Sequence, residues 1–322
     1  EIRLSLVGSE MCIRDRDYLG VVCKQFPRYS EYYGTIKESG IGLACEEAAR
    51  IILSENRPFS METAACDEEY EPSSEYDSSF ALQIFAAREA VFKILAKESL
   101  SIHEKLIVIL DMGSKIQQCI NTDEYDNIKS VVNDYLKEGI AHTLDETRNL
   151  SDSGQFEDIS LQQGIRQILY PYEEMEVLNP EWEVILKDII DSLFEQMSDE
   201  EYNILNEEFG TYMVSRAYEY RQLLEYLVFR YFAKSIYDYD FLGKCQMLVT
   251  NFFVIRQMDI IRWLDNHREY SFKDRMDVVH IFSRQVEYSE DNIENLYEDF
   301  IFDDIFKTDS LIAILWIDSE NI

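Results

Sequence analysis

Apolar residues recur at helical spacing in three stretches of the first half of the chain. Between residues 80 and 97 they lie three or four positions apart, which is the period of one face of an α-helix. Ser78 and Ser79 precede this stretch, and their hydroxyl groups can cap its first turn. The stretches that share the pattern are residues 80–97, 102–120 and 123–140. They predict consecutive antiparallel helices that pack ridges into grooves.

The second half continues this pattern after a polar segment at residues 145–158, which predicts a linker. Further helices are predicted at residues 161–169, from Pro180 onward, at 199–210 and at 242–265. Pro171 and Gly210 are expected to end the first and the third of these. The last is apolar on all sides and should be a central, buried helix. No stretch alternates strongly with a period of two, and no fixed-length repeat is present.

The predicted fold class is therefore mostly α, with an irregular cysteine-containing N-terminal segment followed by a multi-helix bundle-like domain. The low counts of glycine (11) and proline (5) in 322 residues also favour long helices. An acidic, aperiodic stretch at residues 61–79 predicts a solvated loop. The segments we expect are residues 1–16, 17–60, the acidic loop 61–79, a helical subdomain 80–150 and an aromatic-rich helical domain 151–322.

The net charge of the chain excludes some classes of binding partner. The chain carries 63 acidic and 30 basic residues, which gives a formal net charge of −33. Such a surface repels phosphate backbones and anionic lipids, so neither a nucleic-acid partner nor a membrane is expected. It suits a partner that presents lysines, although an acidic balance is also a common solubility feature. No apolar run reaches the length of a membrane span.

Six cysteines are scattered along the chain without the spacing of a disulfide framework. This usage fits a reducing compartment, and we expect a cytoplasmic protein. Cys23 and Cys45 bracket a glycine-containing segment, and Cys45 directly precedes a stretch with helical spacing. A thiolate at such a helix entry is stabilised by the first-turn N–H groups. The alternative is that both cysteines pack as small hydrophobic side chains.

The residues around these two cysteines form a long ordered string. It reads Cys-Lys-Gln-Phe-Pro-Arg from Cys23 and ends in Cys-Glu-Glu-Ala-Ala-Arg from Cys45. This string resembles the flagellin lysine-N-methylases. The matching residues are Cys23, Pro27, Arg28, Glu38, Cys45, Glu47, Ala49 and Arg50. Glu46 departs from the proline that the family usually has, a change that affects only the first helical turn.

A second block near the C-terminus resembles the same family. The family pattern is of the type Ser-Arg-x-x-Glu-His-Ser-x-x-Asn, and the matching residues are Ser283, Arg284, Glu287, Ser289 and Asn292. Tyr288 departs from the pattern, because a histidine is expected there. The resemblance spans residue 17 to about residue 300, with loose similarity between the two blocks.

The resemblance implies a protein-lysine N-methyltransferase that moves methyl groups from S-adenosylmethionine to lysine ε-amines of flagellin. Family members have a cysteine-rich N-terminal part, which implies that Cys23 and Cys45 belong to a thiolate set holding an iron–sulfur cluster or, alternatively, zinc. Such centres usually need about four ligands, and residues 17–60 supply only two of them. We therefore expect residues 17–60 to be the remnant of a metal-binding segment, and the fragment to be inactive.

The first sixteen residues do not fit a natural protein. Residues 5–16 read as the translation of a transposase-type sequencing adaptor, and the chain starts with glutamate. The stretch lacks the basic start and the sustained apolar core of a secretory signal. We expect residues 1–16 to be an adaptor-derived artefact joined to a truncated reading frame.

Lysine methylation needs a neutral amine, although a free lysine has a pKa of about 10.4. An apolar pocket disfavours the ammonium form, and a carboxylate or tyrosine can orient the nitrogen. From residue chemistry we expect Glu287 and Tyr288 to orient the amine. Arg28 and Arg284 are expected to bind the carboxylate of S-adenosylmethionine by bidentate pairing. For each of the four residues the alternative is a surface or structural ion pair.

The C-terminal third is rich in tyrosine and phenylalanine. Rings at helical spacing are typical of a core, and the alternative is that they line a substrate pocket and attract the donor's sulfonium. The sequence contains no glycine-rich nucleotide loop, no His-Glu-x-x-His pair and no Gly-x-Ser-x-Gly elbow. Two alternatives to the methylase stay open: a non-catalytic metal-binding or redox protein, and a helical protein-interaction scaffold.

Overall fold

The computed structural model describes residues 26–54, 56–57, 59–65, 77–152 and 159–320. The predictions for residues 1–16 and for Cys23 lie outside these residues. So does most of the predicted acidic loop, of which residues 61–65 and 77–79 are described. In the described part of the chain, no helix is long and apolar enough to span a membrane. The three cysteines described, Cys45, Cys119 and Cys245, are free thiols.

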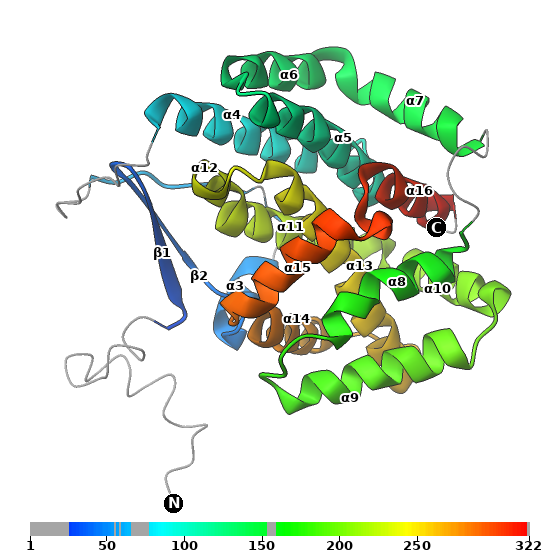
Figure 1. The fold of residues 1–322 in the computed structure, drawn as a ribbon. Coiled ribbons are helices and arrows are strands. Elements are labelled where there is room, and N and C mark those ends of the chain that lie inside the picture. The colour runs from blue at the N-terminus through cyan, green and yellow to red at the C-terminus, as the bar shows by residue number, and fades with distance from the viewer. Residues whose placement is uncertain (1–25, 55, 58, 66–76, 153–158, 321–322) are drawn as a thin grey trace, which may run out of the picture.

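Helices make up most of the described chain, which confirms the mostly-α class (Figure 1). In chain order they are α3 (Glu46–Leu53), α4 (Ser78–Leu95), α5 (Ile102–Asn121), α6 (Ile128–Asp134), α7 (Ile140–Asp152), α8 (Leu161–Glu173), α9 (Pro180–Ile189), α10 (Asp199–Met213), α11 (Ala217–Tyr231), α12 (Ser235–Asp238), α13 (Phe241–Asp265), α14 (Phe272–Val286), α15 (Glu290–Phe302) and α16 (Thr308–Glu320). Short 3₁₀ or π segments lie between several of them.

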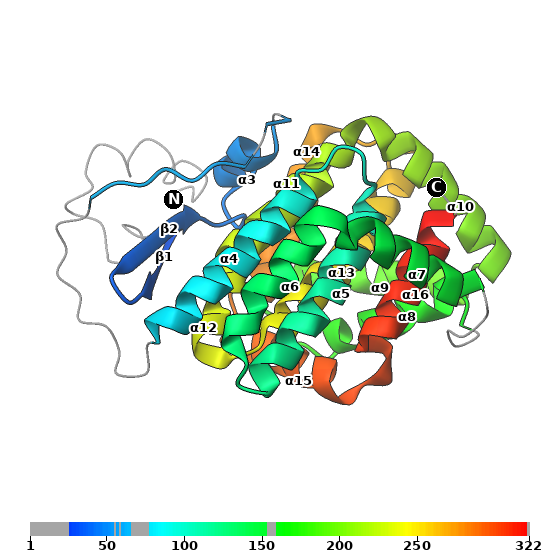
Figure 2. The same cartoon turned by 90° about the horizontal axis from the view of Figure 1, so that it is seen from above.

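The long helix α13 is the centre of the fold. It packs against α5, α11, α14, α8 and α9, and nearly all of its side chains are buried. As expected for residues 242–265, a helix that is apolar on all sides is covered on all sides. Figure 2 shows α4, α5, α6 and α7 as a layer on one face of the bundle, with α16 beside α7.

The segment expected to be irregular contains an antiparallel hairpin of β1 (Arg28–Tyr33) and β2 (Ile36–Ile41). Gly34 makes the turn at a φ of 60°, a left-handed conformation that glycine adopts without a Cβ clash. A period of two was not evident because polar and aromatic residues occur on both faces of the hairpin. The hairpin and α3 lie together on one side of the helical body (Figures 1 and 2).

Tertiary packing overrides the predicted linker at residues 145–158. After a π segment (Tyr135–Gly139), the chain continues as α7 through Asp152, so the first half of the predicted linker is helical. α7 packs on α16, where the Trp316 indole N–H donates to the Thr147 hydroxyl at 3.1 Å. The polar side chains that suggested a linker therefore lie on a helix that other helices hold in place.

Three predicted helix ends were wrong. Pro171 lies inside α8 and Gly210 inside α10, both in buried positions. A proline near the end of a helix removes a single backbone donor, and burial of the surrounding face outweighs that loss. The N-cap of α4 is Asp77 rather than Ser78 or Ser79, because its carboxylate accepts two first-turn N–H groups at 2.8 and 3.2 Å.

Candidate functional site

The two sequence blocks meet where α14 ends. Cys45 is the N-cap residue of α3, as its position before a helical stretch predicted, and α3 packs against α14. The Phe26 ring lies 6.4 Å from the ring of Tyr288, the second residue after α14. A Cβ added to Gly42 would lie 3.4 Å from the Tyr288 hydroxyl. The structure therefore places Tyr288 beside the loop that joins the hairpin to α3.

Glu287 directly follows α14, and its side chain is completely buried. Its Oε2 atom accepts hydrogen bonds from the hydroxyls of Tyr226 (2.7 Å) and Tyr231 (3.1 Å), and Nε of Arg230 lies 2.9 Å away. Its Oε1 atom has no hydrogen-bond partner among the described residues. We call these four residues the Glu287 cluster. Oε2 thus has three polar partners, whereas Oε1, which is also buried, has no donor among the described residues.

Burial sets the protonation of the tyrosines in this cluster. It raises the pKa of Tyr226 and of Tyr231 well above 10, and the nearby Glu287 charge adds to the effect. Both phenols therefore stay protonated near neutral pH and donate to Glu287. Tyr29 of β1 joins them, because the Arg230 guanidinium lies over its ring at 4.2 Å. The site is thus built from α11, the end of α14 and the hairpin.

The register of the hairpin decides which of its residues face the helices. Glu38 faces them and forms a two-point ion pair with Arg88 of α4, one contact of which measures 2.7 Å. Ser30 and Ser39 are hydrogen-bonded at 2.8 Å on the opposite face. Arg28 shares that outer face and is exposed. It therefore projects away from the face that bears on the Glu287 cluster.

The other predicted site residues are dispersed. Arg284 is exposed on α14 close to His280, and burial together with the Arg284 charge lowers the pKa of that imidazole. Cys45 is near enough to Tyr288 to contribute, after burial, to a raised pKa of the phenol. Within the described residues, no group of three or more His, Cys, Asp or Glu side chains is placed to hold a metal ion. The metal role predicted for Cys23 and Cys45 stays a prediction.

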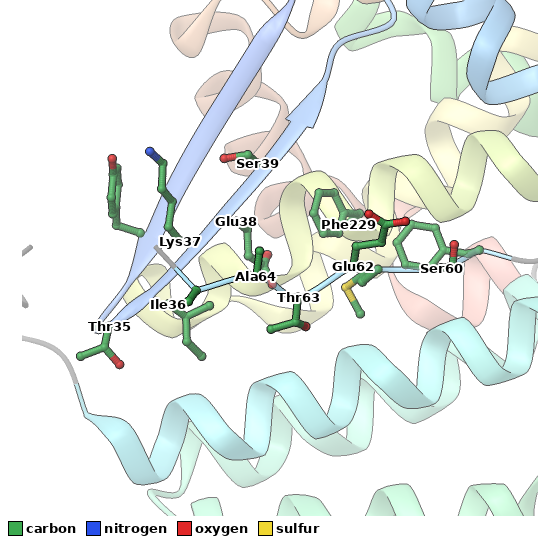
Figure 3. A pocket seen from close by; sticks show the side chains of 15 residues that line it. Thr35, Ile36, Lys37, Glu38, Ser39, Ser60, Glu62, Thr63, Ala64 and Phe229 are labelled. Atoms are coloured by element: carbon green, nitrogen blue, oxygen red, sulfur yellow. The ribbon is translucent and has the colours of Figure 1, made fainter. Parts of the chain in front are cut away.

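A groove with two adjoining hollows leads from the hairpin to this cluster. The larger hollow, of about 660 Å³, lies between residues 34–39 and the extended residues 59–65, with Phe229 at the end where Ser60 lies (Figure 3). The smaller, of about 320 Å³, shares Phe59, Ser60 and Phe229 with it. Four aromatic residues line the smaller hollow: Tyr29, Phe59, Tyr226 and Phe229. Both volumes fall within the ~300–1,000 Å³ typical of ligand pockets.

Charged groups lie along one wall of the smaller hollow. Glu225 lines it, and Nη1 of Arg221 donates to both carboxylate oxygens at 2.8 and 2.9 Å. Burial raises the pKa of Glu225 although Arg221 opposes the shift, and burial with the Arg221 charge lowers the pKa of Lys105. Tyr226 belongs both to this hollow and to the Glu287 cluster. A group bound in the hollow can therefore reach a phenol whose proton points at Glu287.

Tyr226, Arg230 and Tyr231 were not expected to act as a unit. Part of their signal in the sequence is spacing, since Tyr226 and Arg230 are four apart and share one face of α11, whereas Tyr231 is the last residue of the helix and no spacing rule groups it with Tyr226. The tyrosine- and phenylalanine-rich tract was expected either to form core or to line a substrate pocket, and its rings do both. Of the ten rings from Tyr212 to Phe241, five are buried (Tyr220, Tyr226, Tyr231, Phe232 and Phe241), and Tyr226 and Phe229 line the groove.

The family model of the FliB lysine N-methylase C-terminal domain matches residues 88–314. No curated protein and no solved structure matches the chain. The matched residues run from α4 into α16 and include α11 and the end of α14, which carry the Glu287 cluster. The hairpin, α3 and residues 59–65 precede the matched region. Because the match covers more than half of the chain, this protein belongs to the family defined by the FliB lysine N-methylase C-terminal domain.

Proposed function

We propose that this protein is an S-adenosylmethionine-dependent protein-lysine N-methyltransferase that acts on flagellin in the cytoplasm. The observation that carries the proposal is that the family match includes both helices of the Glu287 cluster. The cluster adjoins an aromatic groove large enough for a side chain and a small molecule. Flagellin as the substrate follows from the family resemblance of the two sequence blocks.

The chemistry is a displacement at carbon. The lone pair of the lysine nitrogen forms a bond to the methyl carbon while the carbon–sulfur bond of the sulfonium donor breaks and sulfur keeps the electron pair. The nitrogen must first lose the ammonium proton, which is unfavourable near neutral pH for a free lysine. Burial in the hollow disfavours the ammonium, so its proton leaves to water more readily than the proton of a free lysine does.

Within the site, Tyr226 is suited to touch the amine. Its hydroxyl proton is donated to Oε2 of Glu287, so its oxygen keeps a lone pair that accepts an N–H from the substrate. Glu287 then acts through Tyr226 as a positioning residue. Tyr288, half exposed next to Gly42, borders the same site and can contact the incoming side chain.

The residues present fit a sulfonium donor in two respects. Aromatic ring faces attract a sulfonium electrostatically, and the groove offers four of them. The unpartnered Oε1 atom of Glu287 accepts a hydroxyl or ammonium donor from a bound molecule. We keep Arg28 and Arg284 as proposed partners of the donor carboxylate, from exposed positions. A metal centre at Cys23 and Cys45 is kept as a proposal to which we assign no step.

The test is methyl transfer by the purified protein to flagellin, with S-adenosylmethionine carrying a labelled methyl group. Mass spectrometry of the digested flagellin should find methyl-lysine that disappears when the donor is left out. Calorimetry of donor binding provides an independent check. A protein that binds no donor and labels no lysine would return the choice to the metal-binding or scaffold alternatives.

A further inference from the structure

Gly42 lies in the loop between β2 and α3, beside the end of α14. It is buried, and its N–H donates to the Pro27 carbonyl at 2.8 Å. A carbon atom in the Cβ position of Gly42 would lie 3.4 Å from the Tyr288 hydroxyl oxygen. The Pro27 carbonyl oxygen would lie 3.5 Å from that atom, and the Tyr226 hydroxyl oxygen 3.9 Å. These are ordinary contact distances, so glycine leaves room here for one heavy atom, and we call this point the Gly42 space.

The three oxygens around the Gly42 space can each accept a hydrogen bond. The Pro27 carbonyl uses one lone pair for the N–H of Gly42 and keeps a second. The Tyr226 hydroxyl donates its proton to Glu287, so its oxygen is an acceptor for another group. The Tyr288 hydroxyl oxygen is an acceptor of the same kind. The space is therefore suited to a group that carries N–H donors.

The charges next to the Gly42 space favour a neutral donor over a cation. Nε of Arg230 lies 2.9 Å from Oε2 of Glu287, so the nearest carboxylate is already paired with a guanidinium. Burial raises the pKa of the Tyr288 phenol, and of the two charges that act on it Arg230 lowers that pKa while Glu287 raises it. The phenol thus stays protonated near neutral pH. The oxygens around the space carry no formal charge that would hold an ammonium in preference to an amine.

A side chain can approach the Gly42 space through the smaller hollow. Gly40 and Ile41, the two residues before Gly42, line that hollow together with Tyr226. The rings of the hollow can pack on the apolar stem of a lysine. Tyr226 belongs to both places, so the end of a lysine lying in the hollow is directed at the Gly42 space.

We propose that the ε-nitrogen of the substrate lysine binds at the Gly42 space, and that the hydroxyls of Tyr226 and Tyr288 limit the number of methyl groups it receives. The inference rests on the proposed lysine methylation and assigns Gly42 as the residue that admits the amine. A neutral primary amine has two N–H groups, one for each hydroxyl oxygen. Each added methyl group replaces an N–H with a larger group that makes no such hydrogen bond, so a methylated lysine binds less well.

The first test fills the Gly42 space. The backbone of Gly42 is not left-handed and the added methyl group makes only ordinary contacts, so Gly42→Ala should keep the urea midpoint of the unsubstituted protein. Ser30→Thr is the control, because it adds one methyl group on the exposed outer face of β1. The probe is a fluorescein-labelled peptide with one central lysine, and anisotropy measures its affinity without a methyl donor. We expect Gly42→Ala to weaken binding at least tenfold and Ser30→Thr to leave it within twofold. Equal affinity of the two variants, or no binding by the unsubstituted protein, overturns the proposal.

The second test removes one of the two hydroxyls. Tyr288→Phe keeps the ring but enlarges the space and removes an acceptor, and Tyr170→Phe makes the same change at an exposed position on α8. Mass spectrometry of methylated flagellin should find the ratio of dimethyl-lysine to monomethyl-lysine raised at least threefold in Tyr288→Phe and unchanged in Tyr170→Phe. A peptide with monomethyl-lysine should also gain affinity relative to the lysine peptide in Tyr288→Phe alone. The same ratio in both variants would end the limiting role of Tyr288.

The two assays separate this inference from the proposed function, since peptide binding is measured without the donor. If binding depends on Gly42 but no lysine of flagellin is methylated, the amine site stands and the methylase proposal falls. If flagellin is methylated and Gly42→Ala changes neither the peptide affinity nor KM, lysine methylation stands and the amine binds elsewhere.

Discussion

Two buried carboxylates of this protein have the same kinds of partner and use them differently. Asp259, in the middle of α13, is contacted by two tyrosines and an arginine, and so is Glu287 at the end of α14. Asp259 uses both oxygens: Oδ1 accepts from Tyr270, while Oδ2 accepts from Tyr220 at 2.5 Å and from Arg275 at 2.7 Å. Glu287 directs every partner to Oε2 and leaves Oε1 open.

We propose that the difference separates a carboxylate that holds the fold from one that binds a ligand. Asp259 is enclosed by α11 and α14, and Arg275 extends its network to Glu219 at 3.0 Å. Burial raises the pKa of Asp259, and Arg275 opposes that shift. Glu287 lies next to the hairpin and the groove. A buried oxygen without a donor is costly, and Tyr226, which binds the other oxygen of Glu287, lines the smaller hollow, so we propose that a bound molecule completes Oε1.

The largest expected effect on stability comes from removing Arg275, which pairs with both Asp259 and Glu219. Arg275→Leu leaves Asp259 and Glu219 buried without their shared cation, and we expect a loss of about 3–5 kcal/mol in the free energy of unfolding. Urea unfolding followed by circular dichroism measures it. The control is Arg50→Leu, which removes an exposed pair with Glu47 and should leave the midpoint unchanged. An unchanged midpoint in Arg275→Leu would mean that the network does not stabilise the fold.

The next prediction concerns Glu287. Glu287→Gln keeps the size of the side chain but removes the charge that orients Tyr226, and we expect kcat to fall about 100-fold with a small change in KM. Glu287→Asp should restore part of the loss. Steady-state methylation of flagellin measures both parameters. A purely structural role predicts instead a lowered Tm in both variants and no separation of kcat from KM.

A third buried carboxylate, Asp318, predicts how the stability of the fold depends on pH. Asp318 also uses both oxygens: His103 Nε2 lies 2.6 Å from Oδ2, and Asn206 donates to Oδ1. Although burial opposes ionisation, Arg256 and His103 hold the pKa of Asp318 at about 2, below its usual 3.8.

Because that pKa is lower in the folded than in the unfolded state, the Asp318 contribution is fully present above about pH 4 and is lost as the pH falls toward 2. We expect it to be about 2 kcal/mol. Urea unfolding between pH 5 and pH 2 measures the slope, and Asp318→Asn should flatten it. An acid limb of the same steepness in Asp318→Asn would assign the acid sensitivity to other carboxylates.

The smallest expected effect on stability comes from two tyrosine variants, which compare the Asp259 and Glu287 sites directly. Tyr220→Phe and Tyr226→Phe each remove one hydroxyl from a buried carboxylate, so each should cost about 1.5 kcal/mol of stability. Only Tyr226→Phe should also slow methyl transfer, because Tyr220 lies away from the groove lining. Paired measurements of unfolding and of methylation decide between the two roles. Equal activity of the two variants would remove Tyr226 from the reaction.

Helices were predictable where the apolar pattern is local and continuous. The stretch expected at 102–120 is α5, and that expected at 242–265 is α13, each with ends within one residue. The helical extension to Asp152 and the hairpin were not predictable in this way, since packing against distant residues stabilises them. Strands form only when they pair, and the pairing of Glu31 with Glu38 carries no clear signal in a single sequence.

The sequence by itself determined the family, through the resemblance of two ordered strings. The expectation that Glu287 and Tyr288 orient the amine came from residue chemistry and stays a prediction. It also determined that Cys45 begins a helix, because capping and helical periodicity are local properties. Only the tertiary structure decided that Arg28 points outward while its neighbour Tyr29 reaches Arg230, since strand register sets the facing of each residue. It alone joined Tyr226 to Glu287, 61 positions apart, because that contact depends on how α11 and α14 pack around α13.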